Sequence, residues 1–214
     1  MLFAAYCYGA VSRNSEWSSD VGLQEIAARR QPLSSVAYNN LGFEYERINK
    51  EKEAIAAYET SIKLNPLNHI AWLNLGTLYG SSKDYKKGIS FINQSINIFP
   101  TYKSYNNLGL LYSEIKDYES AVFYLRKAIE HDPKISKAYM DLGTVYAQTG
   151  EFDMALEEFN KALEINPNIA DIHYNIAILY EYLDQLDKAK EHFSIAYHLE
   201  PDNNLYKERY LTYK

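Results

Sequence analysis

Cysteine is almost absent from this sequence. The single residue Cys7 among 214 positions excludes an internal disulfide and leaves the redox compartment open. Long apolar runs are scarce as well: the N-terminal run Leu2–Val11 has only ten residues, whereas a helix that crosses a membrane needs about 20. No basic segment precedes that run, as it would in a signal peptide. The sequence therefore has to be stabilised by a packed core and not by cross-links.

An excess of charge is missing too. The 22 lysines and arginines and the 28 acidic residues give a formal charge of −6, and they form no block of like charges. A surface that binds nucleic acid needs concentrated positive charge. We therefore expect no nucleic-acid partner.

The signatures of catalysis are absent from the sequence. The glycines form no glycine-rich phosphate loop, and the five histidines show no HExxH or comparable metal-ligand spacing on one helix face. The order of serine, histidine and aspartate residues does not indicate a nucleophilic triad. We therefore expect a protein that is not an enzyme and that needs no metal and no cofactor.

What the sequence does contain is a regular internal repeat. The segment YNNLGFEY at Tyr38–Tyr45 returns four times, at intervals of 34, 33, 34 and 34 residues. Its later copies are Trp72–Tyr79, Tyr105–Tyr112, Tyr139–Tyr146 and His173–Tyr180. All six prolines keep nearly the same interval, at Pro32, Pro66, Pro100, Pro133, Pro167 and Pro201. Self-similarity at a fixed period of this size is typical of a stacked repeat architecture.

The apolar spacing within one repeat predicts two antiparallel helices. Trp72, Leu75 and Tyr79 recur at steps of three and four residues and form one helical face. We expect Trp72 and Leu75 to be buried between the two helices of their repeat. A second apolar series with helical spacing follows in the same repeat, before the proline that ends it. Glycine inside a helix costs about 1 kcal/mol relative to alanine, so Gly76 indicates a close approach of the two helices. Neither helix pair can bury its apolar stripe alone, so neighbouring repeats have to stack.

The pattern Trp72-x2-Leu75-Gly76-x2-Tyr79, followed by small and apolar residues and Pro100, resembles the tetratricopeptide repeat (TPR). The resemblance implies an all-α, right-handed superhelical solenoid. The implied repeats are 35–68, 69–101, 102–135, 136–169 and 170–203, preceded by a degenerate N-terminal unit at 1–34 and followed by a capping helix at 204–214.

The N-terminal segment allows two interpretations. Leu2–Val11 is either a short capping helix on the first repeat or the end of a transmembrane helix. A resemblance supports the interpretation as a transmembrane helix. Residues 12–40 are similar to the junction between membrane helices and TPR repeats in transmembrane-and-TPR O-mannosyltransferase-like proteins. The residues that carry this likeness are Arg13, Asn14, Trp17, Leu23 and Pro32, while Gln24 departs from the aromatic residue expected there.

The resemblance to TPR proteins also implies a concave groove lined by the first helix of each repeat. Positions are counted from the first residue of each repeat. Position 6 is asparagine in four of the five copies. An amide offers a donor and an acceptor together, so a row of them can bind the backbone of an extended peptide, as in superhelical TPR domains of protein glycosyltransferases. The residues expected in this peptide-binding groove are Asn40, Asn74, Asn107, Asp141, Asn175, Phe43, Leu73, Lys103, Lys137, Tyr174 and Tyr182.

A different TPR ligand is not expected. The carboxylate clamp of chaperone-binding TPR domains needs several cations and asparagines at fixed positions, and only Asn74 and Lys103 match it. A chain-terminal carboxylate requires paired cations. The groove instead favours a peptide with apolar anchors and little net charge.

We therefore expect a non-enzymatic scaffold that binds a peptide or a partner protein. Two alternatives remain: the soluble tail of a multi-pass membrane glycosyltransferase-like protein, and a self-associating structural module that uses an apolar face left exposed at the N-terminus. A free scaffold is expected in the cytoplasm. The tail of a membrane protein is expected at the periplasmic or luminal face of a membrane.

Deletion of residues 1–12 separates the two interpretations of the N-terminus. A capping helix covers the apolar face of the first repeat, so its loss should lower the melting temperature. A membrane remnant contributes no packing, so its loss should improve solubility and leave the melting temperature unchanged. Thermal melts of the full chain and of the shortened chain distinguish the two interpretations. A clearly lower melting temperature of the shortened chain contradicts the interpretation as a membrane remnant.

Overall fold

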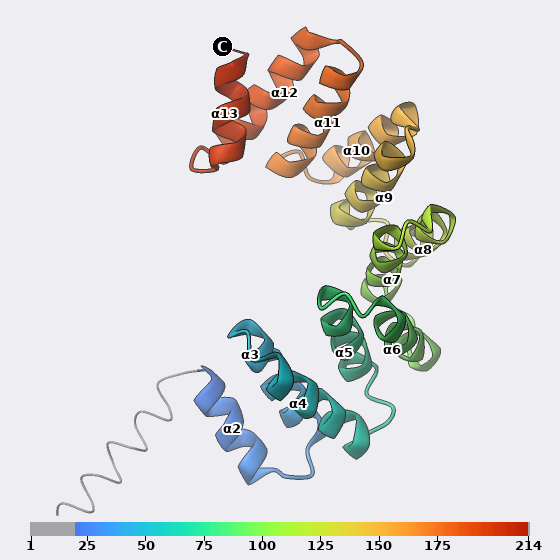
Figure 1. The fold of residues 1–214 in the computed structure, drawn as a ribbon, viewed down its shortest axis with the longest axis vertical. Helices are drawn as coiled ribbons and strands as arrows, with labels where there is room; N and C mark the ends of the chain where they lie inside the picture. Colours follow the sequence, from blue (N-terminus) through green and yellow to red (C-terminus); the bar gives the residue numbers. More distant parts are fainter. Residues whose placement is uncertain (1–19, 214) are drawn as a thin grey trace, which may run out of the picture. The chain divides into compact units, whose positions relative to one another are not determined.

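The structure of the chain, a computed structural model, describes residues 20–213, which form helices and no strand (Figure 1). The apolar run Leu2–Val11 and the junction residues Arg13, Asn14 and Trp17 lie outside the described residues. The chain divides into two compact units, Met1–Pro100 and Thr101–Lys214. Each unit is described by itself below.

In the first unit, residues 20–100 form two antiparallel helix pairs and one further helix. Its helices are α2 (Asp20–Arg30), α3 (Ser35–Arg47), α4 (Glu51–Leu64), α5 (His69–Ser81) and α6 (Tyr85–Ile98). Helix α2 packs on the first pair, because Ala28 shares an apolar cluster with Leu41 and Ala57. The hydroxyl of Tyr45 on α3 also donates a hydrogen bond of 2.8 Å to Glu25 on α2.

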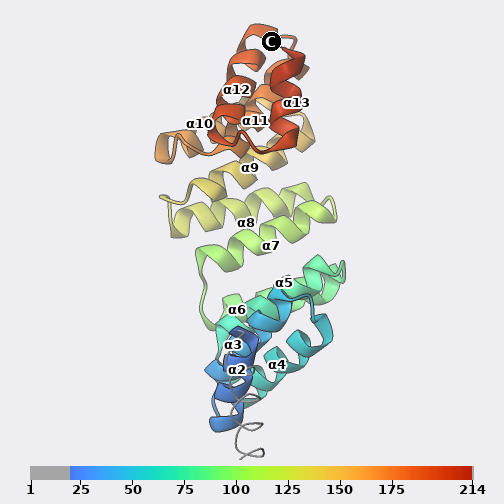
Figure 2. The ribbon, with the colours of Figure 1, turned by 90° about the vertical axis from the view of Figure 1, so that its left-hand side faces the viewer.

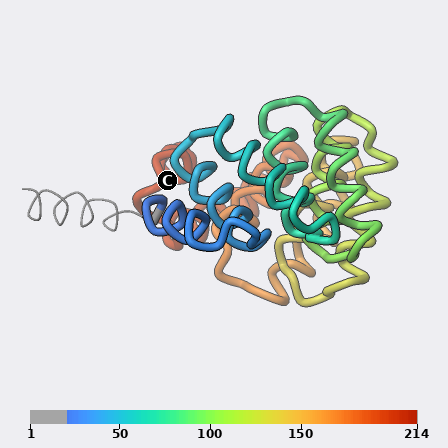
Figure 3. The backbone as a smooth tube through the Cα atoms, turned by 90° about the horizontal axis from the view of Figure 1, so that it is seen from below, coloured from blue at the N-terminus to red at the C-terminus, as the bar shows by residue number. Residues whose placement is uncertain are grey.

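The second unit contains three helix pairs and a terminal helix. Its helices are α7 (Tyr102–Glu114), α8 (Tyr118–His131), α9 (Ser136–Thr149), α10 (Phe152–Ile165), α11 (Ala170–Tyr182), α12 (Leu186–Leu199) and α13 (Asn204–Thr212). Figure 2 shows α7 and α8 lying side by side, and the tube in Figure 3 shows the short turns that reverse the chain between successive helices. The prediction of an all-α solenoid built from helix pairs is confirmed.

A left-handed residue reverses the chain inside every repeat. Position 15 has a positive φ in all five copies, at Asn49, Lys83, Lys116, Gly150 and Asp184. The next residue donates its backbone N–H to the tyrosine carbonyl at position 11, as from Glu151 to Tyr146 at 2.9 Å. This bond closes the end of the first helix and directs the chain into the second helix. Only one of the five copies uses glycine there, so the turn carries no glycine signature in the sequence.

The expected close approach of the two helices in a repeat is confirmed. A Cβ atom on Gly76 would lie 2.9 Å from the backbone oxygen of Gly88 and 2.7 Å from the side chain of Ile92. On Gly143, a Cβ would lie 2.8 Å from the ring of Phe159 and 3.1 Å from the oxygen of Ala155. Position 8 is therefore glycine because the backbone and the position-24 side chain of the second helix occupy the space of a methyl group.

The core of the repeat lies between its two helices. Leu75 is 1 % exposed, and Ile92 opposite it is fully buried. Trp72 is only half-buried, which corrects the expectation of a buried indole. Its ring packs on Phe91, with centroids 5.6 Å apart, and its indole N–H donates to the carbonyl of Pro66 at 2.9 Å. The side chain therefore bridges the core and the preceding turn.

The substitution Leu75→Ala should lower the free energy of unfolding by about 2–5 kcal/mol, because it leaves a cavity at a fully buried site. The matched control is Leu67→Ala, since Leu67 is 72 % exposed and a surface change should stay within about 0.5 kcal/mol. Urea melts measure both values. Equal stability of the two variants would contradict the assignment of the core.

The fifth repeat places two imidazoles where the second repeat has two apolar aromatic rings. His173 and His192 occupy the same register positions as Trp72 and Phe91. Nε2 of His173 lies 3.0 Å from the carbonyl of Pro167, which can only accept, so this nitrogen carries the proton. The Nδ1 atom of His173 then accepts from Nδ1–H of His192 at 3.1 Å. The sequence alone gave no indication that these two histidines meet.

This pair should make stability depend on pH. Burial, and then the neighbouring His173, lower the pKa of His192, while Glu191 acts weakly in the opposite direction. The ring of Tyr180 also faces His192, with centroids 5.8 Å apart. Because the unfolded histidine titrates near pH 6.5 and the folded one titrates lower, the unfolded state binds more protons in between. Stability is therefore lost as pH falls below about 6.5, by at most about 1.4 kcal/mol per pH unit.

The substitution His192→Phe, which copies Phe91, should reduce the loss of stability between pH 7.5 and pH 5. Unfolding free energies from urea melts at both pH values give the difference for each protein. His69 also has a pKa lowered by burial, so the variant His69→Phe serves as the comparison for a second contributing site. An unchanged difference in the His192 variant would contradict this assignment.

Candidate functional site

The position-6 residues of the first helices connect successive repeats. In the first unit, Asn40 is exposed, while the half-buried Asn74 donates from Nδ2 to Oδ1 of Asn39 at 3.1 Å. In the second unit, Asp141 is 6 % exposed and accepts from Nδ2 of Asn106 at 2.8 Å. Residues at position 5 of one repeat and position 6 of the next thus form polar contacts across the repeat boundary within each unit.

The other expected groove residues divide into exposed and covered ones. Phe43 is 55 % exposed and Tyr182 is 74 % exposed. Lys103 is exposed, and Lys137 is exposed while its Nζ lies 3.3 Å from Asp141. Asn107 and Asn175 are half-buried.

Three of the expected groove residues are covered in the structure: Asp141, whose contacts are given above, Leu73 and Tyr174. Leu73 is 8 % exposed and so has almost no area to offer a ligand. The ring of Tyr174 lies 5.2 Å from that of Tyr206 on α13 and 5.6 Å from that of Phe193 on α12, measured between ring centroids. The terminal helix therefore takes the space into which Tyr174 points.

Helix α13 also satisfies two acidic residues of α11. The hydroxyl of Tyr206 donates to Asp171, and burial together with this bond raises the pKa of Tyr206 well above its usual value. Glu181 accepts from the hydroxyl of Tyr213 at 2.5 Å and from the guanidinium of Arg209 at 3.2 Å. These carboxylates are therefore engaged within the chain.

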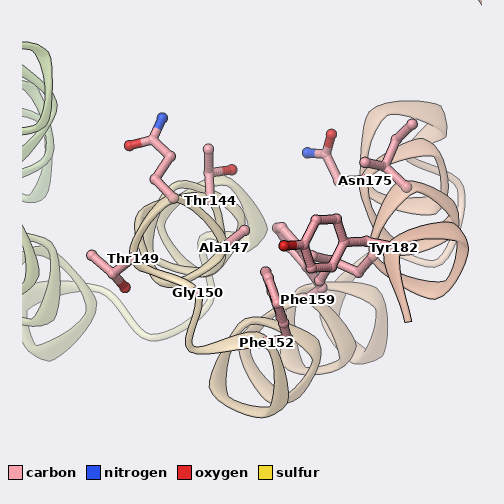
Figure 4. A pocket seen from close by; sticks show the side chains of 11 residues that line it. Thr144, Ala147, Thr149, Gly150, Phe152, Phe159, Asn175 and Tyr182 are labelled. Carbon is pink, nitrogen blue, oxygen red and sulfur yellow. The ribbon is translucent and has the colours of Figure 1, made fainter. Parts of the chain in front are cut away.

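A cleft of about 540 Å³ lies between α9, the start of α10 and α11 (Figure 4). Its apolar lining consists of Ala147, Phe152, Phe159, Ile178, Leu179 and Tyr182. Its remaining lining consists of Thr144, Gln148, Thr149, Gly150 and Asn175. No lining residue carries a charge. The cleft is thus an uncharged hollow with an apolar wall and a few polar groups, which is the composition of many small binding sites.

The aromatic wall of the cleft is formed by two helices. The rings of Phe152 on α10 and Tyr182 on α11 lie with centroids 4.7 Å apart. Figure 4 shows these rings close together, with the side chain of Asn175 entering the same space from α11. The Asn175 amide makes no hydrogen bond within the part of the chain that the structure describes. An amide beside an aromatic wall can therefore donate to and accept from a ligand.

Sequence reasoning found only part of this cleft. Asn175 and Tyr182 were expected in the groove, and both line the cleft. Phe152 and Phe159 were not expected there, because they belong to a second helix, which the resemblance does not place on the groove. No sequence signal indicated Phe152, because its place in the cleft follows from the left-handed turn at Gly150, and that turn has no glycine signature in the other repeats.

Metal-holding clusters and membrane-spanning helices are absent from the described residues. Among them, no group of three or more histidine, cysteine, aspartate or glutamate residues is arranged to hold a metal ion. In residues 20–213, no helix combines the length and the apolar character needed to cross a membrane.

Family models agree with the repeat architecture. Models described as "Tetratricopeptide repeat" match residues 35–68, 57–89, 102–135, 124–157 and 170–203, and one described as "TPR repeat" matches residues 143–184. A comparison with curated proteins gives no match.

Several solved structures have a similar fold. YrrB, described as a TPR protein with an unusual peptide-binding site, superposes with a TM-score of 0.63 at 23% identity, over 86% of this chain and 96% of its own. MamA gives a TM-score of 0.66 at 26% identity, over 76% of this chain and 95% of its own. PilF from Pseudomonas aeruginosa gives a TM-score of 0.75 at 17% identity, over 97% of this chain and 94% of its own.

Proposed function

Because this chain is a tetratricopeptide-repeat protein, we propose that it is a non-enzymatic scaffold that binds a peptide segment of a partner protein in the cleft between α9 and α11. The observation that carries the proposal is the combination of Tyr182 and Asn175 on one helix. Tyr182 is an aromatic side chain that is 74 % exposed, and the half-buried Asn175 has no partner among the described residues. Together they provide an apolar anchor site and a backbone contact.

The cleft has a suitable size for a peptide side chain. Its volume of about 540 Å³ falls within the range of about 300–1,000 Å³ typical of ligand pockets. Leu179 and Phe159 are 4 % and 1 % exposed and form the rigid base of the hollow, while Tyr182, which is 74 % exposed, offers most of its contact area to a ligand. An apolar ligand side chain that fills the hollow would lose its contact with water, which favours binding by about 25 cal/mol per Å² of apolar area.

The contrast with the first unit favours this location over the full asparagine row. The Asn74 amide already donates to Asn39, so a peptide would compete with a contact that links two repeats. The amide of Asn175 has no such contact within residues 20–213. The row formed by Asn40, Asn74 and Asn107 stays a prediction. The similarity to YrrB, whose description names a peptide-binding site, is consistent with a peptide as the ligand.

The substitution Tyr182→Ala should weaken peptide binding tenfold or more, because exposed aromatic anchors dominate such interfaces. Asn175→Ala should weaken it by about two- to tenfold, the value of one or two neutral hydrogen bonds. A peptide array first identifies ligands of the full chain, and fluorescence anisotropy then measures the affinity of each variant.

The matched control is Phe123→Ala, since Phe123 is an aromatic residue that is 55 % exposed on α8 and does not line the cleft. It should leave affinity unchanged. If Tyr182→Ala binds the array ligands as tightly as the Phe123 variant does, the cleft is not the binding site.

A further inference from the structure

In the first unit, the chain segments that connect one repeat to the next lie side by side. The side chain of Asn68, which precedes α5, donates from Nδ2 to the hydroxyl of Ser35 at the start of α3, at 2.9 Å. The hydroxyl of Ser95 on α6 donates to the carbonyl of His69 at 2.8 Å. The rings of His69 and Phe99 lie with centroids 5.1 Å apart. The ends of α2, α4 and α6 therefore lie along one edge of the first unit.

This edge consists of residues 29–36, residues 63–70 and Phe99, and is called the turn edge below. Its surface is apolar, because Leu33 is 84 % exposed, Leu67 is 72 % exposed and Phe99 is 58 % exposed. Each of these side chains follows the last turn of a helix. A row of exposed apolar side chains on neighbouring turns marks a contact surface.

The same positions are polar in the second unit. Leu33 and Leu67 each precede the first residue of a repeat by two positions. The residues at this position before the last two repeats and before the terminal helix are Lys134, Asn168 and Asp202. The repeat therefore folds without an apolar residue there, so the two leucines serve a purpose other than folding.

The turn edge also lacks carboxylates. Residues 26–43 and residues 60–83 contain no aspartate and no glutamate. The exposed cations in the last turns of α2 and α4 are Arg29, Arg30 and Lys63. Arg29 lies 3.4 Å from Glu25, and its side chain is still 69 % exposed. The projecting apolar side chains are thus accompanied by positive charge.

Acidic residues of the first unit gather at the other end of its helix pairs. Glu44 and Glu46 lie in the last turn of α3, Glu51 and Glu53 lie in the first turn of α4, and Asp84 precedes α6. Because the two helices of a pair are antiparallel, these acids lie at the opposite end from the turn edge. The charge of the first unit therefore favours approach of an anionic surface with the turn edge first.

We propose that the turn edge docks the first unit on a membrane surface that contains anionic lipids. The three projecting apolar side chains enter the interfacial layer of the bilayer, where they leave water. The three cations lie at the level of the lipid phosphates, to which basic residues beside a membrane are attracted. A lipid surface is favoured over an acidic protein, because a bilayer accommodates projecting side chains at any spacing, whereas a protein has to offer a complementary hollow for each of them.

Vesicle flotation with the full chain tests this inference. One set of vesicles contains phosphatidylcholine alone, and the other also contains about 30 mol % phosphatidylserine, the anionic lipid of cytoplasmic leaflets. At 20 mM NaCl we expect at least fivefold stronger binding to the vesicles with phosphatidylserine. At 0.5 M NaCl the two sets should bind within about twofold of each other, because salt screens exposed charges.

A pair of leucine substitutions tests the apolar contact. The variant with Leu33→Ser and Leu67→Ser should bind the phosphatidylserine vesicles at least tenfold more weakly, because it removes the two most exposed apolar side chains of the turn edge. The matched control carries Leu186→Ser and Leu211→Ser, which replace leucines of the second unit that are 47 % and 55 % exposed. It should bind the vesicles as the unchanged chain does. Thermal melts verify that both variants are folded.

Two triple variants test the position of the charge. The first replaces the three cations of the turn edge by Arg29→Gln, Arg30→Gln and Lys63→Gln. It should reduce the preference for phosphatidylserine vesicles threefold or more. The control removes the same charge from the opposite end of the helix pairs, by Lys50→Gln, Lys52→Gln and Lys86→Gln. It should leave the preference unchanged.

Several results would overturn the inference. It fails if the full chain binds neither set of vesicles, if it binds both equally at low salt, or if either control variant loses as much binding as its test variant. It also fails if soluble polyglutamate binds the chain and its leucine variant equally and displaces the chain from vesicles, because the turn edge then recognises acidic chains. A dimeric full chain and a monomeric leucine variant in size-exclusion chromatography would instead show an interface between two copies.

Discussion

The close approach of two helices at position 8 of each repeat determines much of the structure. A Cβ atom at Gly76 would lie within 3 Å of the backbone of Gly88 and Ile92, so the first helix lies directly against the second. That contact requires a small residue at position 20 and brings one large side chain, such as Phe159, fully into the interface. In the fifth repeat Ala177 replaces the glycine and shares a buried cluster with Phe193, so this helix pair accommodates one methyl group. One steric condition thus fixes which face of each helix is buried.

Once the buried face is fixed, the inner face has to serve two purposes. Within each unit, some of its polar residues connect neighbouring repeats, as Asn106 does with Asp141. Other polar residues of the inner face can hydrogen-bond to a ligand. Asn175 is one of them, since it lies beside the apolar residues Ile178 and Tyr182 in the cleft and bonds to no described residue. The available amide is therefore found where the aromatic wall is, and this coincidence gives the cleft both an apolar and a polar contact for a ligand.

The sequence predicted the helices well, because a period of 34 residues with three- and four-residue apolar steps describes a local property of the chain. It predicted the inner face less well, because exposure there depends on residues about 30 positions away. Leu73 has the register of a groove residue and is buried, and Tyr174 has the same register and is covered by α13. The sequence did not predict Phe152 as a cleft residue for the same reason, because its place in the cleft depends on how the turn at Gly150 directs α10. A periodic pattern specifies which residues share a helix face, but the neighbouring helices decide which part of that face stays open.

The last repeat shows how the end of the stack is closed. A terminal repeat has no following pair to cover its inner side, and α13 covers it with tyrosines that donate to carboxylates, Tyr206 to Asp171 and Tyr213 to Glu181. These bonds satisfy the two acids on the side of α11 that faces the terminal helix. The terminal helix thus uses two carboxylates of the fifth repeat to hold its own position on α11 and to close the end of the stack.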